Sequence, residues 1–312
     1  MSAADPARIA MIARRYARLP DAELEARLAN IVVLLSAPRS GSTLLFDLLS
    51  RSRQVLTIGG ETHAVYRQFP HLAAENPEFD SGMLDARHAD PETVRMFRCM
   101  FLAMLRNNQG RLLHDLPGRS TEGYVIVEKT PRNALNLPFL KHVFPNARYV
   151  FLHRDAAETI ASLIEGWETG ARTGRFVTYR KLPGWDREQW CFVLPRGWRA
   201  LIGRPLADIC AFQWNACNDQ ILADLGDAPM IGVSYQALID APEMVLTALG
   251  ERLNIAGPWQ QWRDAALPTS ASTVTPPSQG KWRLRAAEVD AVLPSTIPTA
   301  RRIESRLGSA CR

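Results

Sequence analysis

The segment IVVLLSAPRSGSTLLFDLL, residues 31–49, constrains the fold of this chain more than any other. Its first five residues are apolar without interruption, which is typical of a strand buried on both faces of a parallel sheet. A short polar turn with Pro38 and Gly41 follows, and residues 44–49 have a helical pattern. The segment therefore predicts a strand, a tight turn and a helix in direct succession.

Further apolar runs and helix-like stretches alternate along the rest of the chain. The expected strands lie at 55–58, 124–129, 148–153 and 230–235, and the expected helices at 5–30, 91–107, 133–143 and from the last strand to about Leu253. Strands that alternate with helices imply right-handed crossovers between parallel strands. We therefore predict an α/β fold with a central parallel sheet flanked by helices.

One stretch, residues 166–215, interrupts this alternation. It holds five of the eight tryptophans, namely Trp167, Trp185, Trp190, Trp198 and Trp214. We expect an irregular, mostly helical insert within a single domain that spans residues 1–312. Two interpretations of the tryptophans stay open: they wall or cover an apolar ligand pocket, or they only anchor a structural excursion.

Charge and cysteine content narrow the class of ligand and the compartment. A net charge of +5 over 312 residues, without dense Lys/Arg clusters, favours a small anionic ligand over nucleic acid. Five cysteines without close pairing indicate reduced thiols, as in a cytoplasm. Arginines interrupt the N-terminal apolar stretch, and no apolar run reaches the length of a membrane span. We expect a soluble cytoplasmic protein without a signal peptide, and the sequence leaves a homodimer open.

The turn after the first strand has the chemistry of an anion-binding loop. Backbone N–H groups and the helix N-terminus converge there, and Arg39 adds a planar positive charge beside Ser40, Gly41, Ser42 and Thr43. A nucleotide-hydrolysing loop follows G-x-x-x-x-G-K-[ST], but serines here replace the first glycine and the lysine. The loop therefore predicts an anion site and disfavours an NTPase. The alternative is an ordinary strand-to-helix turn.

A second candidate anion site follows a later strand, in FLHRDAAETIASLIEGW at 151–167. Arg154 lies at the carboxyl end of that strand, the edge where doubly wound sheets bind ligands. Asp155 and Glu158 resemble a capping box that starts a helix, and Ser162 lies two turns further on. Arg154 and Ser162 could together hold a second phosphate, or Arg154 could be a plain surface arginine.

Together, APRSGSTLL and RDAAETIAS resemble the sulfotransferases that use 3′-phosphoadenosine-5′-phosphosulfate (PAPS). The first looks like their 5′-phosphosulfate loop and the second like their 3′-phosphate segment. The resemblance is closest to the branch with tyrosylprotein sulfotransferases and many bacterial relatives, whose loop has arginine where cytosolic sulfotransferases have lysine. It covers roughly residues 30–165, and residues 166–215 match nothing in the family. The resemblance implies a P-loop-like three-layer fold with PAPS as co-substrate.

Sulfuryl transfer also needs a group that takes the proton of the attacking hydroxyl. Glu61, after the second strand, resembles the glutamate given that role in the tyrosylprotein branch, and His63 is its rival because imidazole titrates near neutrality. In the resemblance, Lys129 helps to hold the transferred sulfuryl group. An ion pair with its neighbour Glu128 is the structural alternative for this lysine.

Two later motifs complete the resemblance. Tyr235, in VSYQAL, resembles a family tyrosine near the nucleotide, although it could equally be a core residue. Ser278 and Lys281, in TPPSQGKWR, could close over the phosphates as part of a clamp at 268–283, or this segment could be a linker.

The sequence thus predicts a sulfotransferase that moves a sulfuryl group from PAPS to a hydroxyl by in-line displacement, with Arg39 stabilising the departing phosphate. A sulfuryl group carries less charge than a phosphoryl group, so we expect no metal requirement. The acceptor could be a small molecule or a peptide: tyrosine, sugar, polyketide and lipid alcohol all remain open. The alternatives are an atypical P-loop small-molecule kinase and a non-catalytic nucleotide-binding protein.

Overall fold

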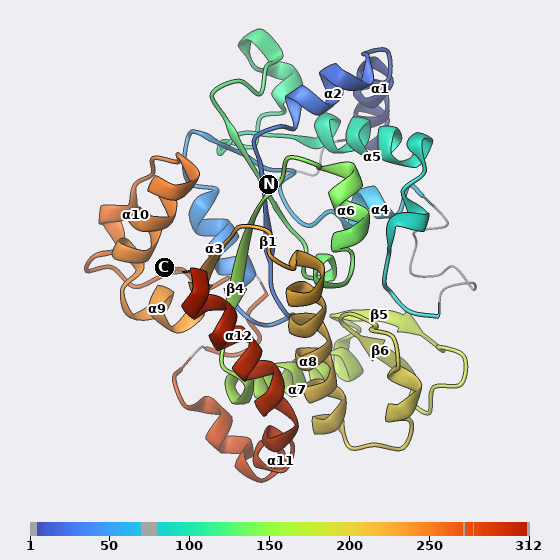
Figure 1. The fold of residues 1–312 in the computed structure, drawn as a ribbon, viewed down its shortest axis with the longest axis vertical. Helices are drawn as coiled ribbons and strands as arrows, with labels where there is room; N and C mark the ends of the chain where they lie inside the picture. Colours follow the sequence, from blue (N-terminus) through green and yellow to red (C-terminus); the bar gives the residue numbers. More distant parts are fainter. Residues whose placement is uncertain (1–4, 70–79, 271, 277, 311–312) are drawn as a thin grey trace.

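Five parallel strands form a central sheet in the order β2-β3-β1-β4-β7 (Figure 1). The structure is a computed structural model, and it describes residues 5–69, 80–270, 272–276 and 278–310. Strand β1 (Ile31–Leu35) lies between β3 (Val125–Lys129) and β4 (Arg148–His153), while β2 (Val55–Leu56) and β7 (Met230–Ser234) form the edges. The prediction of a parallel α/β sheet is confirmed.

Helices cover both faces of the sheet, because alternate residues of each buried strand point to opposite sides. Val32 and Leu34 of β1 pack with α3 (Ser42–Leu49), α9 (Tyr235–Asp240) and α10 (Pro242–Leu253). Ile31, Val33 and Leu35 belong to a larger core on the other face. Helices that contribute to this core include α1 (Pro6–Tyr16), α2 (Asp21–Arg27), α4 (His63–Tyr66), α5 (Pro91–Met104), α6 (Leu137–Val143), α7 (Ala156–Thr173) and α8 (Leu206–Leu225). The three-layer prediction is therefore confirmed.

Prolines break two helices that the sequence pattern predicted to be continuous. The expected helix at 5–30 is two helices, α1 and α2, and Pro20 lies at the N-cap of the second. The stretch after β7 is likewise divided into α9 and α10, with Pro242 as the first residue of α10. Proline has no N–H to donate to the preceding turn, and it is well placed at the start of a new helix.

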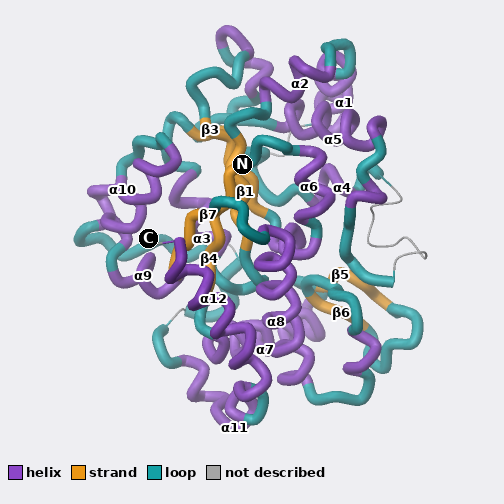
Figure 2. Tube along the Cα trace, viewed as in Figure 1, coloured by secondary structure: helices purple, strands orange, loops and turns teal. Residues whose placement is uncertain are grey.

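The tryptophan-rich insert contains an antiparallel hairpin, where we expected mostly helix. Helices α7 and α8 enter and leave the insert, and between them β5 (Val177–Arg180) pairs with β6 (Gln189–Cys191). Figure 2 shows this pair of strands apart from the central sheet. The ring of Trp190 lies 4.8 Å from that of Trp185, 5.3 Å from Trp167 and 5.9 Å from Trp198. The tryptophans therefore fix the hairpin to the helices through a shared core.

The C-terminal part packs beside α7 and α8. It consists of a 3-10 turn at Lys281–Arg285, α11 (Ala286–Asp290) and α12 (Ile297–Ala310), and Figure 1 shows α12 alongside α8. Within the described ranges, no helix is both long enough and apolar enough to cross a membrane.

Candidate active site

The loop between β1 and α3 has the shape that its sequence predicted. Gly41 is the N-cap of α3 and has a φ of 95°, in the left-handed region that favours glycine. A Cβ atom at this position would lie 2.2 Å from the ring of Tyr235. The glycine therefore allows Tyr235, at the end of β7, to lie directly against the loop.

Arg39 links this loop to two distant segments. Its Nε atom donates a hydrogen bond to Ser162 Oγ at 3.1 Å, and its Nη1 atom donates to the carbonyl oxygen of Ser272 at 2.5 Å. The guanidinium also lies 5.1 Å from the ring centroid of Phe176. Burial lowers the pKa of Arg39 to about 10, opposed by the charge of Glu165, so the group stays protonated at neutral pH.

Arg154 follows β4 and also faces the loop. One of its Nη atoms donates to the carbonyl oxygen of Arg39 at 3.1 Å, and its guanidinium stacks 4.5 Å from the ring centroid of Tyr235. A further contact joins it to Glu158 at 3.4 Å. Its Nε atom is buried and has no hydrogen-bond partner among the residues that the structure describes. The two arginines and Ser162, which the sequence placed in separate motifs, thus converge.

The predicted clamp segment, residues 268–283, lies on acidic side chains of α7. Lys281 Nζ donates to Glu165 Oε1 at 3.0 Å, and Thr275 Oγ1 donates to the same carboxylate at 2.5 Å. The N–H of Gly280 donates to Glu158 Oε1 at 2.7 Å. Two residues of this segment, at positions 271 and 277, lie outside the described part of the chain.

A cavity of about 180 Å³ lies between the loop, α7 and this segment. We call it the clamp cavity, and its lining includes Arg39, Gly41, Arg154, Ser162, Tyr235, Ser278 and Lys281. All of these were predicted to bind the nucleotide.

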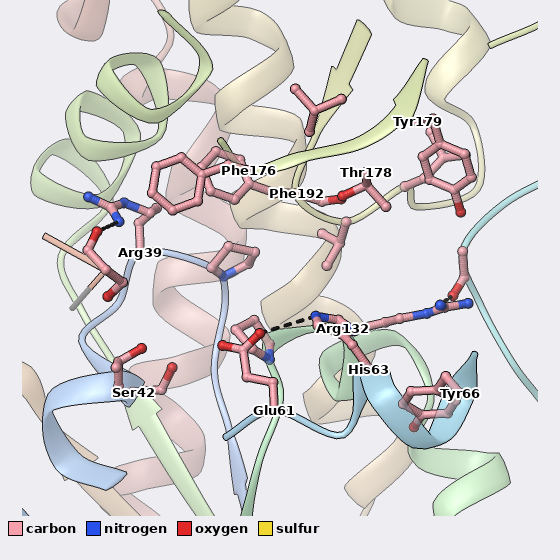
Figure 3. A pocket seen from close by; sticks show the side chains of 18 of the residues that line it. Arg39, Ser42, Glu61, His63, Tyr66, Arg132, Phe176, Thr178, Tyr179 and Phe192 are labelled. Carbon is pink, nitrogen blue, oxygen red and sulfur yellow. Dashed lines mark hydrogen bonds and ion pairs between the residues drawn. The ribbon is translucent and has the colours of Figure 1, made fainter. Parts of the chain in front are cut away.

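Three residues that were predicted for the transfer step and not for nucleotide binding meet on the opposite side of the loop, namely Glu61, His63 and Lys129. Lys129 Nζ donates to Glu61 Oε1 at 2.7 Å and to Thr43 Oγ1 at 3.1 Å. His63 Nε2 lies 3.1 Å from Glu61 Oε2, as Figure 3 shows. The Lys129 side chain is only 4% exposed and lies over the ring of Phe46. A buried ammonium requires such a partner, and its partner is Glu61 rather than Glu128.

The contacts of Glu61 determine its charge. Burial by itself raises the pKa of this carboxyl, but the hydrogen bond from His63 and the charge and hydrogen bond of Lys129 outweigh that effect. The resulting pKa is about 2, so Glu61 is ionised at neutral pH. The partners of Glu61 therefore strongly stabilise its ionised form.

A second cavity, of about 430 Å³, extends from these residues to the hairpin (Figure 3). We call it the hairpin cavity, and its lining includes Arg39, Gly41, Ser42, Thr43, Glu61, His63, Arg132, Phe176, Tyr179, Phe192 and Leu194. None of the five tryptophans of the insert belongs to it. Four of them, Trp167, Trp185, Trp190 and Trp198, form a structural core. Phenylalanines and tyrosines supply the aromatic wall of the cavity instead.

Phe176 and Phe192 are the main site residues that sequence reasoning missed. Their rings stack with centroids 5.2 Å apart, and both have a positive φ, 67° and 63°, which is rare for an aromatic residue. Phe192 packs over Gly166 of α7, where a Cβ would lie 2.4 Å from the ring. The only sequence signal was the short stretch FVTYR, whose β-branched and aromatic residues favour a strand.

Comparison with known proteins assigns the chain to a family. Residues 31–261 match the family described as the sulfotransferase family. The chain belongs to the sulfotransferase family. The resemblance inferred from the two loop motifs is thereby confirmed.

The chain is similar to several known proteins at low sequence identity. Protein-tyrosine sulfotransferase A of Caenorhabditis elegans is 23% identical over 239 residues, which are 75% of this chain and 51% of that protein. The chain thus spans about half the length of the curated relative it matches. The crystal structure of a sulfotransferase from Alicyclobacillus acidocaldarius has the same fold, with a TM-score of 0.50 and 13% identity over 89% of this chain and 95% of that one. A sulfotransferase domain from the curacin biosynthetic pathway matches with a TM-score of 0.45 and 17% identity, over 84% of this chain and 97% of that one.

Proposed function

We propose that this sulfotransferase moves a sulfuryl group from PAPS to the hydroxyl of an acceptor held in the hairpin cavity. The observation that carries the proposal is the position of the loop between two cavities. Arg39 and Gly41 line both the clamp cavity and the hairpin cavity. A group that leaves a nucleotide on one side can therefore be passed across the loop to an acceptor on the other side.

In this proposal the donor lies along the loop and the clamp cavity. The loop N–H groups, Ser42 and Thr43 hold the phosphosulfate, as helix N-termini hold anions. Arg154 and Ser162 hold the 3′-phosphate, and Tyr235 lies beside the nucleotide. Buried donors without partners are rare in proteins, so the unpartnered Nε of Arg154 supports an anionic ligand at this point.

The transfer is an in-line displacement. The acceptor oxygen forms a bond to sulfur while the bond between sulfur and the bridging phosphate oxygen breaks, and the electron pair stays on that oxygen. Arg39 stabilises the charge that develops on the departing phosphate, and Lys129 contacts the sulfuryl oxygens. Positioning and charge stabilisation supply most of the catalysis in such reactions.

The proton of the acceptor passes to the Glu61–His63 pair. Glu61 is the first acceptor in this proposal, because it is ionised and lies next to Lys129. When Lys129 turns to the sulfuryl group, the carboxylate loses one of the contacts that lower its pKa and becomes a stronger base. His63 then orients Glu61 through the remaining hydrogen bond.

The hairpin cavity suits a hydroxyl on an apolar or aromatic group of a small molecule or a peptide, since phenylalanine rings form part of its wall. We place the activity in a reducing compartment, the cytoplasm. All four cysteines in the described residues are free and buried, which supports this location.

The direct test is incubation with PAPS and a panel of phenols, sugars and aliphatic alcohols, with chromatographic detection of adenosine 3′,5′-bisphosphate (PAP). We expect PAP together with a sulfated acceptor, and no ADP when ATP and magnesium replace PAPS. ADP formation with no turnover of PAPS would instead identify the protein as a kinase. PAP binding without turnover of any acceptor would indicate a non-catalytic nucleotide-binding protein.

A further inference from the structure

Glu128 is a second buried carboxylate beside the site, next to Lys129 on β3 but on the opposite face of the strand. Consecutive residues of a strand point to opposite sides, so Glu128 does not face Glu61 or the loop. Its side chain is 1% exposed. Three polar groups surround it, and all three donate hydrogen bonds to it.

The donors come from two segments. Thr62 Oγ1 and Thr130 Oγ1 both donate to Glu128 Oε1, at 2.5 and 2.7 Å. Asn133 Nδ2 donates to Oε2 at 2.5 Å. Burial raises the pKa of this carboxyl to about 7, opposed by its hydrogen bonds and by the charge of Lys129. The three hydrogen bonds from two segments make Glu128 a rigid junction.

The junction reaches both ends of α4, the short helix that starts with His63. Thr62 is the N-cap of α4, yet its side chain makes no capping bond and donates to Glu128 instead. At the other end, Tyr66 donates from its hydroxyl to Asn133 Oδ1 at 3.0 Å, and Asn133 donates in turn to Glu128. Glu128 is therefore the common acceptor that fixes the helix at its N-cap directly and at its last residue through Asn133.

The residues on either side of Thr62 are Glu61 and His63. The N–H of Thr62 also donates to Thr130 Oγ1 at 2.8 Å, so backbone and side chain of this one residue are both fixed to β3. A rotation of Thr62 would move the Glu61 carboxylate away from Lys129 and the His63 ring away from Glu61.

We propose that Glu128 is a positioning residue, which holds Glu61 and His63 in place by accepting the hydrogen bonds of Thr62 and Asn133. The inference rests on the proposed function, because Glu61 and His63 need alignment for catalysis only if that function is right. The alignment itself is defined by the hydrogen bonds that Glu128 accepts.

A matched pair of substitutions at Thr62 separates the hydrogen bond from the bulk of the side chain. Thr62→Val keeps the shape but removes the donor, whereas Thr62→Ser keeps the donor and removes a methyl group. Glu128→Gln replaces one acceptor oxygen by an amide NH2 donor at nearly constant volume. If Glu128→Gln does not fold, the Thr62 pair still decides the question.

The first readout is amide hydrogen exchange, which needs no substrate. We expect Thr62→Val and Glu128→Gln to exchange faster than wild type over residues 61–66, with β1 and β4 unchanged and Thr62→Ser like wild type. Equal exchange in all four proteins would overturn the proposal. Exchange over residues 61–66 that is as fast in Thr62→Ser as in Thr62→Val would also overturn it.

The second readout is catalysis, measured as PAP-dependent release of p-nitrophenol from p-nitrophenyl sulfate. We expect kcat of Thr62→Val and Glu128→Gln to fall roughly 10- to 100-fold, as for misplaced catalytic groups, while Kd for PAP stays within about twofold. A purely structural role would lower PAP affinity and kcat together and would overturn the proposal. Failure of the wild type to bind PAP would contradict the proposed function and leave the exchange result valid.

Discussion

Arg39 Nε donates a hydrogen bond to Ser162 Oγ at 3.1 Å, which joins the loop after β1 to helix α7 after β4. The two residues are 123 positions apart and belong to the two motifs that carry the family resemblance. Parallel strands end at the same edge of a sheet, and this is why motifs so distant in the sequence meet. The contact forms the border between the clamp cavity and the hairpin cavity.

Replacement of Arg39 tests its role in the transfer. We expect Arg39→Ala to lower kcat by roughly 100- to 1,000-fold, because one stabilising donor at a developing negative charge has about that effect. Arg39→Lys should be intermediate, since it keeps the charge but loses the planar fork that reaches two partners. The far-ultraviolet circular dichroism of both variants should match wild type. Near-normal turnover of Arg39→Ala would show that this role is wrong.

The pKa of Glu61 predicts how stability depends on pH. The unfolded carboxyl binds its proton near its ordinary pKa of 4.5, but in the folded protein it does so only near 2. Its contribution to folding is therefore complete above pH 4.5 and lost as the pH falls from 4.5 to 2. We expect Glu61→Gln to melt below wild type at pH 6, with a smaller difference at pH 3. A difference that is constant with pH would contradict this assignment.

The ion pair between Lys281 and Glu165 predicts a contribution of the clamp to nucleotide binding. If Lys281 transfers from Glu165 to the phosphates of PAP, Lys281→Ala should weaken PAP binding by about 1.5–3 kcal/mol, the value of a charged hydrogen bond. Lys181→Ala is the matched control, because this exposed lysine lines neither cavity. Calorimetric titration measures the PAP affinity of both variants. Equal affinities of Lys281→Ala and Lys181→Ala would rule out a clamp at Lys281.

Phe192 predicts where the acceptor binds. Its ring forms part of the hairpin cavity and does not line the clamp cavity, so truncation should affect the acceptor alone. We expect Phe192→Ala to raise KM for p-nitrophenyl sulfate by roughly tenfold, in line with the loss of one buried aromatic contact, and to leave PAP affinity unchanged. Phe176 is less suitable for this test because it also contacts Arg39. An unchanged KM would place the acceptor elsewhere.

The sequence predicted the central strands of the sheet well because each contains an uninterrupted apolar run. Residues 31–35, 125–127 and 149–152 are apolar and buried, so no register or partner had to be known. Convergence of Arg39, Arg154 and Ser162 followed from the same topology. Helix ends were less predictable, since Pro20 and Pro242 interrupt stretches whose hydrophobic pattern continues across them.

Contacts between residues distant in the sequence could not be predicted where they depend on tertiary packing alone. Lys129 had carboxylates available at positions 61 and 128, and only the direction of β3 decides that Glu61 is its partner. The tryptophans of the insert were prominent in composition, but four of the five pack on one another: Trp167, Trp185, Trp190 and Trp198. The wall of the cavity is formed by Phe176 and Phe192, which the hairpin brings together from 16 residues apart, counting from 176 to 192.

The measurement that tests the account most directly is a thermal melt with PAP, beside one with ATP and magnesium. A ligand at about a hundred times its Kd stabilises the folded state by roughly 2.7 kcal/mol, which is visible as a rise in Tm. We predict a rise with PAP alone, and a smaller rise with PAP for Arg39→Ala. A rise only with ATP and magnesium would contradict the assignment of the loop and the clamp cavity to a sulfuryl donor.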